Sequence, residues 1–346
     1  MTEDVRKTIA IRADGNHILG MGHLMRCLSI ARELRKYADC VFLVAEEAAG
    51  HFLREKGVHC EVLETDYRNM NAELAMLDEL YDSYHFSFLL VDSYQCTQEY
   101  LDAWMKYCPV YRMDDVGENE LFSTGLINYN VYAKELDYSC ITGRKMQLLL
   151  GAEYAPVREE FLQTPYEVKA AVSRILITMG GSDALNIAGK LCEILLRKTE
   201  IQAELVVVCG RFNAHLAELK QLQTENSRVK IMVDVPDMWD KMAQADIAIS
   251  AAGSTMYELS AMGVPTISCY YVENQRQIAE GFAKEAGVLN AGNYVGNEGI
   301  VLKNIVEETI ALIHSYGKRV ELSNKMKRLT DGRGAARITE YILKRI

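Results

Sequence analysis

A histidine follows two closely spaced glycines near the start of the chain, in Gly20-Met21-Gly22-His23. Glycines let the backbone come close to a ligand, and the helix that we expect here offers unpaired N–H groups and its positive dipole end. This environment favours a neutral imidazole that can accept a proton near neutral pH. We therefore predict that His23 is a general base and that Gly22 contacts the substrate. The alternative is a histidine that only caps or packs.

The glycine spacing argues against a nicotinamide cofactor. In the dinucleotide fingerprint Gly-x-Gly-x-x-Gly, the third glycine would fall on Met25. A dehydrogenase is therefore not indicated.

Two further glycine loops precede predicted helices in the second half of the chain. In Gly180-Gly181-Ser182-Asp183, the glycines and Ser182 can cradle a diphosphate, whereas Asp183 could simply cap the next helix. In Gly253-Ser254-Thr255, the backbone N–H groups suit phosphate oxygens. Glu258 follows one turn later and could accept both hydroxyls of a ribose, or only complement the helix dipole.

Other polar residues also come directly after predicted strands. Asn274 and Gln275 could bind sugar hydroxyls, although Asn274 might equally be only an N-cap. Asp92 and Tyr94 follow a strong strand, and Asp114-Asp115 follows the next one. Our hypothesis for the residue that orients His23 is Asp14. The chain has no Asp-x-Asp, so we predict no metal and no cofactor.

Short aliphatic runs alternate with segments of helical period, which is typical of a parallel sheet flanked by helices. The pattern occurs twice. The first half has predicted strands at 8–13, 40–45, 58–63, 86–92, 109–114, 125–128 and 146–150, and a helix at 22–36. The second half has strands at 174–179, 204–209, 229–233, 247–250 and 265–269, helices at 184–198, 215–225, 238–243, 255–262 and 274–286, and helical structure from 298 onward.

The 346 residues are enough for two domains. We predict an α/β protein with two Rossmann-like domains and an interdomain cleft. Residues 1–158 form the N-terminal domain with the catalytic loop, 159–173 a linker, 174–330 the C-terminal nucleotide-binding domain, and 331–346 a helix that packs toward the first domain.

Composition narrows the class of partner and the compartment. A net charge of -10 argues against binding to nucleic acid, which requires a basic face. The longest apolar runs fall far short of a membrane span. Nine cysteines without a Cys-x-x-Cys pair indicate free thiols in a reducing compartment. We expect a cytoplasmic protein without stable membrane insertion, and its oligomeric state is left open.

The motifs together resemble one family. They are Arg12-Ala13-Asp14-Gly15, the segment from Gly20 to Cys27, Gly180-Gly181-Ser182-Asp183, the segment from Ala251 to Glu258, and Glu273-Asn274-Gln275. The chain resembles the UDP-2,4-diacetamido-2,4,6-trideoxy-β-L-altropyranose hydrolases of pseudaminic acid synthesis and the related spore-coat polysaccharide proteins.

The resemblance implies a GT-B fold, UDP bound by the second domain, and a final helix that returns to the first. It also implies that His23 activates a water for inverting, metal-independent hydrolysis of a UDP-sugar. Ser93 departs from the histidine that many relatives carry. We expect substrate contacts from Arg12, Asp14, Gly22, Tyr94, Asn274 and Gln275, and UDP contacts from Gly181, Ser182, Gly253, Ser254, Thr255 and Glu258.

Three rival functions could be carried by the same scaffold. A GT-B glycosyltransferase of surface or spore-coat polysaccharide synthesis would use His23 to deprotonate an acceptor hydroxyl in place of water. A UDP-sugar 2-epimerase would need additional carboxylates near the sugar. A catalytically idle nucleotide-sugar binder would not need His23.

Overall fold

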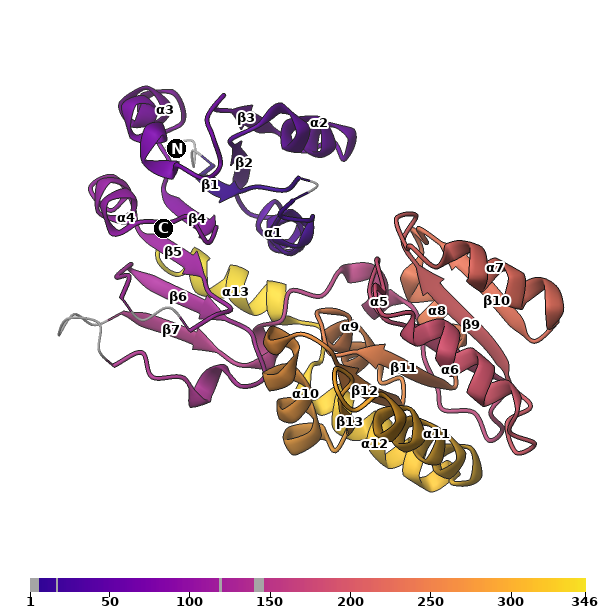
Figure 1. Ribbon diagram of the computed structural model, residues 1–346. Coiled ribbons are helices and arrows are strands. Elements are labelled where there is room, and N and C mark those ends of the chain that lie inside the picture. Colours follow the sequence, from indigo (N-terminus) through magenta and orange to yellow (C-terminus); the bar gives the residue numbers. More distant parts are fainter. Residues whose placement is uncertain (1–5, 17, 118–119, 140–145) are drawn as a thin grey trace. The chain divides into compact units, whose positions relative to one another are not determined.

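A computed structural model describes residues 6–16, 18–117, 120–139 and 146–346. The chain divides into two compact units, of which unit 1 comprises Met1–Val157 with Arg333–Ile346 and unit 2 comprises Arg158–Gly332 (Figure 1). Within the described ranges, no helix is both long and apolar enough to cross a membrane.

Unit 1 contains a parallel sheet of seven strands in the order β3-β2-β1-β4-β5-β6-β7. The first strand lies inside the sheet, between β2 and β4, and its residues Ile9 to Ile11 are fully buried, as expected for a strand covered on both faces. The strands are β1 (Thr8–Ala13), β2 (Asp39–Val44), β3 (Cys60–Val62), β4 (Phe88–Asp92), β5 (Val110–Met113), β6 (Gly125–Asn128) and β7 (Gln147–Leu150).

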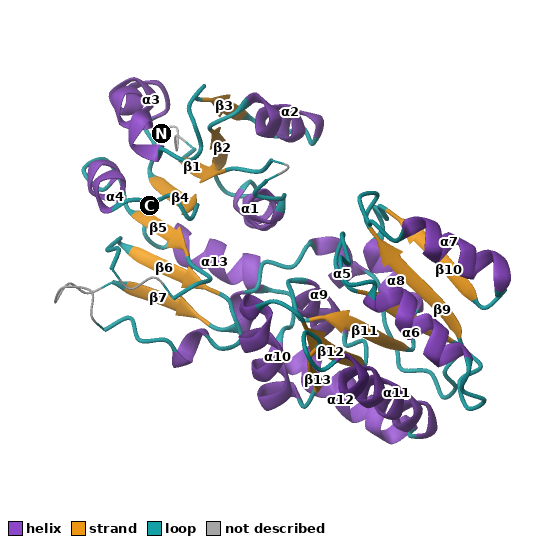
Figure 2. Ribbon diagram, viewed as in Figure 1, coloured by secondary structure: helices purple, strands orange, loops and turns teal. Residues whose placement is uncertain are grey.

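Helices and short 3-10 turns connect these strands (Figure 2). The helix predicted at 22–36 is α1, and its buried face carries Leu24, Cys27, Ala31 and Leu34, with Leu28 partly buried beside them. The helical elements of unit 1 are α1 (Gly22–Leu34), α2 (Glu47–Glu55), η1 (Met70–Met76), α3 (Leu77–Tyr84), α4 (Gln98–Trp104), η2 (Ala133–Glu135), η3 (Ala152–Tyr154) and α13 (Gly334–Leu343).

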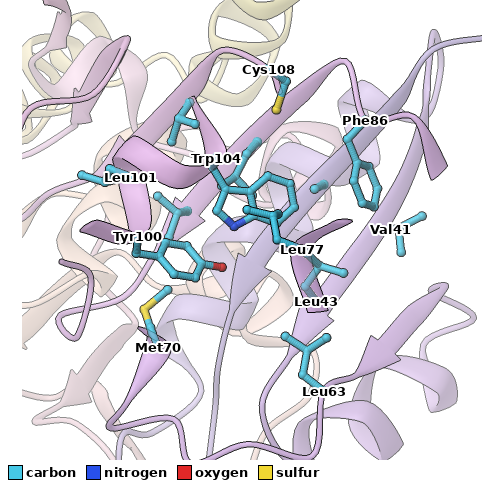
Figure 3. Close-up of a cluster of buried hydrophobic side chains, with 14 residues drawn as sticks. Val41, Leu43, Leu63, Met70, Leu77, Phe86, Tyr100, Leu101, Trp104 and Cys108 are labelled. Atoms are coloured by element: carbon cyan, nitrogen blue, oxygen red, sulfur yellow. The ribbon is translucent and has the colours of Figure 1, made fainter. Parts of the chain in front are cut away.

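A cluster of buried side chains fills the space between this sheet and the helices that follow β3 and β4 (Figure 3). Trp104 of α4 packs against Tyr100 and Phe86, with ring centroids 6.4 and 5.9 Å away. Strand residues such as Leu43 complete the cluster. This core holds the carboxyl ends of β1 and β4 in place.

Unit 2 contains a second parallel sheet, of six strands in the order β10-β9-β8-β11-β12-β13. The strands are β8 (Arg174–Thr178), β9 (Glu204–Cys209), β10 (Val229–Val233), β11 (Ile247–Ala251), β12 (Thr266–Tyr270) and β13 (Leu289–Asn293). Our predictions missed β13 because its sequence, Leu-Asn-Ala-Gly-Asn, is poor in strand-forming residues.

The helices of unit 2 begin within a few residues of the predicted positions. The predicted helical C-terminal region is three separate helices, interrupted at Ser315 and again at 330–333. The segment 159–173, for which we expected a linker, carries a short helix with Phe161 buried. The helices of unit 2 are α5 (Glu159–Gln163), α6 (Ile187–Leu196), α7 (Leu216–Glu225), α8 (Met238–Gln244), α9 (Thr255–Met262), α10 (Glu273–Ala286), α11 (Glu298–His314) and α12 (Tyr316–Leu329).

The last helix, α13, belongs to unit 1, where it packs against α1 and η3. Its first residue, Gly334, lies directly against the backbone of residues 154–155. A Cβ at this position would lie 2.2 Å from the carbonyl oxygen of Ala155. Only glycine therefore fits at the start of α13 without a shift of the backbone.

Candidate active site

His23 is the second residue of α1 and is 8% exposed. Gly20 adopts a φ of 74° and donates its N–H to the Asn16 carbonyl, which turns the chain into the helix. Gly22 begins the helix and is exposed. The glycine loop thus delivers His23 to the carboxyl edge of the sheet, as predicted.

Asp92, not Asp14, is the carboxylate that orients His23. The Nδ1 atom of His23 lies 2.7 Å from Oδ1 of Asp92. Asp92 is the last residue of β4, which neighbours β1, and its Cα pairs with that of Ala13. The hypothesis that Asp14 orients His23 was wrong, because the carboxylate of Asp14 accepts the N–H of Ala45 and pairs with Arg12.

The surroundings of Asp92 determine which nitrogen of His23 carries the proton. Burial alone would raise the pKa of Asp92, but the guanidinium of Arg26 and the hydrogen bonds from Arg26 and His23 hold it well below its ordinary value. An ionised carboxylate only accepts hydrogen bonds, so Nδ1 of His23 must be the donor. In the neutral ring, Nε2 then keeps its lone pair and can accept a proton.

Arg26 lies one helical turn after His23 and binds two carboxylates. Its Nε and Nη2 each donate to Asp92 over 2.5 Å, and its Nη1 donates to Asp115 over 2.8 Å. Nη2 is also 3.0 Å from Nδ1 of His23. Because arginine has no acceptor and Nδ1 already donates to Asp92, this last contact is a close approach without a hydrogen bond.

Tyr94 lies beside this cluster, in the loop after β4. Its ring contacts that of His23 edge-to-face, with centroids 4.8 Å apart, and its hydroxyl donates to Asp115 over 2.9 Å. The side chain is 56% exposed. Tyr94 is therefore in a position to meet a ligand near His23, whereas Asp114 is buried and accepts the N–H groups of Val116 and Gly117.

Arg12 and Asp14, which we expected to bind substrate, form part of the core of unit 1. Arg12 is 0% exposed and donates to both Asp14 and Glu73. Glu73 of η1 also accepts the hydroxyl hydrogen of Tyr100. A guanidinium without exposed surface has no access to a ligand, so we withdraw Arg12 as a substrate contact, whereas the contact expected from Asp14, which is 5% exposed, stays a prediction.

In unit 2, the loops after β8, β11 and β12 share the carboxyl edge of the sheet, because these strands are neighbours. Gly181 and Ser182 are exposed in the first loop. Asp183 is buried, and its carboxylate accepts the N–H groups of Ile187 and Ala188 over 2.9 Å. The predicted capping role of Asp183 is confirmed, because its carboxylate satisfies the first two amides of α6 although Asn186 is the N-cap residue.

The second loop begins α9. Gly253 donates its own N–H to Ala251 over 2.9 Å, so the amides of Ser254 and Thr255 are the ones that open the helix. Glu258 lies in the first turn of α9, with its side chain 23% exposed and Oε1 3.3 Å from Nη2 of Arg158. Burial raises the pKa of Glu258 to about 7, although Arg158 opposes the shift.

The third loop is held to the first by Tyr271, whose hydroxyl donates to the carbonyl of Met179 over 2.8 Å. Gln275 accepts the N–H of Tyr271 through its side chain. Asn274 is exposed in the first turn of α10, and Val272 is the N-cap residue. The alternative role of Asn274 as an N-cap was therefore wrong, and its amide faces solvent.

Known proteins share both sequence and architecture with the chain. Residues 174–309, which span the sheet of unit 2, match the glycosyltransferase family 28 C-terminal domain. The spore coat polysaccharide biosynthesis protein SpsG of Bacillus subtilis is 25% identical over 344 residues, covering 96% of this chain and 97% of that protein. The UDP-2,4-diacetamido-2,4,6-trideoxy-beta-L-altropyranose hydrolase of Campylobacter jejuni is 24% identical over 279 residues, covering 80% and 96%.

Among solved structures, MurG of Acinetobacter baumannii superposes with a TM-score of 0.69 at 13% identity, covering 98% of this chain and 99% of that one. The chain has the GT-B fold. The predicted fold class is thereby confirmed, and the relatives are distant.

Sequence reasoning missed two charged residues of these sites. Arg26 had an available signal, because the spacing of three residues from His23 places both on one face of a helix. Arg158 had none, since its pairing with Glu258 joins residues 100 positions apart.

Proposed function

We propose that the protein hydrolyses a UDP-linked amino-deoxy sugar, UDP-2,4-diacetamido-2,4,6-trideoxy-β-L-altropyranose or a close relative, to UDP and the free sugar. The observation that carries the proposal is the hydrogen bond from His23 to Asp92, which leaves Nε2 of His23 as a proton acceptor. The names of the relatives from Campylobacter jejuni and Bacillus subtilis support the substrate class.

In this reaction, Nε2 of His23 takes a proton from a water molecule as its oxygen attacks the anomeric carbon. The bond from that carbon to the diphosphate oxygen breaks, its electron pair stays with UDP, and the configuration inverts. The imidazolium formed at His23 is stabilised by Asp92. Tyr94 and Asn274 contact the sugar. The amides of Ser254 and Thr255 with the Gly181-Ser182 loop meet the charge of the diphosphate, and Glu258 accepts the ribose hydroxyls.

A glycosyltransferase is the second candidate, favoured by the match of residues 174–309 to the family 28 C-terminal domain. In that case, His23 deprotonates the hydroxyl of an acceptor sugar or lipid. The chemistry at the donor is the same.

One assay separates the two candidates. The protein is incubated with a panel of UDP-sugars, without added metal, and UDP and free sugar are measured with and without acceptors. Hydrolysis predicts UDP and free sugar in equal amounts without any acceptor, and loss of turnover in His23→Ala with UDP affinity nearly unchanged. UDP release only in the presence of an acceptor would establish the transferase, and full turnover by His23→Ala would refute the role of His23.

A further inference from the structure

Arg26 contacts both carboxylates behind His23 and Tyr94. It donates two hydrogen bonds to Asp92 and one to Asp115. Asp92 in turn accepts from His23, and Asp115 accepts from Tyr94. We propose that Arg26 is a positioning residue. By holding Asp92 and Asp115, it leaves Nε2 of His23 and the hydroxyl oxygen of Tyr94 as hydrogen-bond acceptors toward the ligand.

The geometry depends on a guanidinium. Its three nitrogens reach two separate carboxylates, and the side chain is only 12% exposed. A lysine ammonium carries the same charge but is a single point with three donors, and it does not reproduce the paired contact to Asp92. Tyr129 also holds the guanidinium, since its hydroxyl accepts from Nη1 over 3.3 Å and its ring centroid lies 5.7 Å from the guanidinium carbon.

The consequence for His23 is a fixed tautomer. Without Arg26, Asp92 loses two of its hydrogen bonds and its main charge partner. A carboxylate that is no longer held in place does not keep its hydrogen bond to Nδ1 of His23, so the ring can also carry its proton on Nε2. Molecules with that tautomer lack the base.

The consequence for Tyr94 is that its hydroxyl oxygen can only accept a hydrogen bond from a ligand. Its hydroxyl hydrogen is used by Asp115, and burial followed by the negative charge of Asp115 raises the pKa of Tyr94, so the phenol stays protonated. Its oxygen then offers only lone pairs to a ligand. The group that meets Tyr94 must therefore be a donor, such as a water, a sugar hydroxyl or an acetamido N–H.

The test compares Arg26→Lys and Arg26→Ala with Arg32→Ala, an exposed arginine on the same helix. The first readout is the ¹⁵N NMR spectrum of the histidine-labelled protein, in which protonated and unprotonated ring nitrogens differ. We expect His23 protonated at Nδ1 in the wild type and in Arg32→Ala, and a mixture of tautomers in Arg26→Ala. Methylguanidine added to Arg26→Ala should restore the wild-type spectrum.

The second readout is kinetic and rests on the proposed hydrolase function. In Arg26→Lys, kcat should fall roughly 10- to 100-fold, with KM changed less than about 3-fold, and methylguanidine should partly rescue Arg26→Ala. If the wild type turns over no UDP-sugar, the proposed function fails while the NMR readout still tests Arg26.

Two results would overturn the proposal. One is an unchanged His23 tautomer in a folded Arg26→Ala protein. The other is a kcat of Arg26→Lys equal to that of the wild type. UDP binding to unit 2 and the thermal unfolding curve identify a variant that has lost its fold. If Arg26→Ala is unfolded, the kcat of Arg26→Lys, which retains the positive charge, tests the proposal.

Discussion

The Nδ1 of His23 lies 2.7 Å from the Oδ1 of Asp92, although 69 positions separate the two residues in the chain. The pairing follows from the sheet order, which places β4 directly beside β1. A histidine held by a buried carboxylate has one nitrogen committed and one available, and this asymmetry leads to the first prediction.

Asp92→Asn should abolish most of the turnover. The amide can present its NH₂ group to Nδ1 of His23 and so favours the tautomer with the proton on Nε2, which cannot act as a base. We expect kcat to fall roughly 10²- to 10⁴-fold, measured as UDP release at saturating substrate. Asp102→Asn, an exposed carboxylate on α4, is the control and should be unaffected. A comparable loss in Asp102→Asn would mean that the assay reports stability.

Glu258 should make nucleotide affinity depend on pH. Its pKa is raised to about 7, and the ionised form is the one that accepts two ribose hydroxyls. Affinity should therefore rise as the pH increases through 7, by up to about 10-fold between roughly pH 6 and pH 8. Calorimetry with UDP-N-acetylglucosamine avoids titration of the ligand in this range.

The Glu258→Gln variant should bind more weakly than the wild type at about pH 8 and show no such dependence. An affinity that falls with rising pH in the wild type would show that the protonated acid is the binding form.

Asp183→Ala should destabilise unit 2 without changing the chemistry. The substitution leaves the N–H groups of Ile187 and Ala188 without their acceptor at the start of α6. The expected loss is about 1 to 2 kcal/mol, measured by denaturant unfolding. At a temperature where the variant is folded, kcat should equal that of the wild type. A selective loss of kcat in the folded protein would instead assign Asp183 to the ligand.

Gly334→Ala should weaken the attachment of α13 to unit 1. The added methyl group meets the carbonyl of Ala155 at 2.2 Å, and the required backbone shift should cost about 1 to 3 kcal/mol. Gly299→Ala is the matched control, because it lies in the exposed first turn of α11 with open space around its Cβ. Thermal unfolding should show a lower midpoint for Gly334→Ala only, and equal midpoints would contradict the packing argument.

Most of the fold could be predicted because the two sheets are built from aliphatic runs that alternate with helical stripes. The exception is β13, which contains Asn290, Gly292 and Asn293. It forms a strand because its backbone pairs with β12, and the local sequence does not indicate this pairing. The positions of the glycine loops could also be predicted, because glycines between a strand and a helix allow the backbone to turn there.

The partners within the candidate site were less predictable. Asp92 was expected at the sheet edge, but the order of the strands decides which side chain it meets. Arg12 looked like a site residue because it stands next to the loop, and only its burial against Glu73 shows otherwise. Sequence position thus predicts the edge on which a residue lies, while the contacts depend on neighbours far along the chain.

Helix α13 packs against α1, the helix that carries both His23 and Arg26. Unit 1 is therefore completed only when residues 333–346 have been synthesised. A premature stop codon that removes α13 would leave every proposed ligand contact in the translated product and yet expose one side of the first helix. The integrity of the site in unit 1 is in this sense encoded far downstream, after all of unit 2.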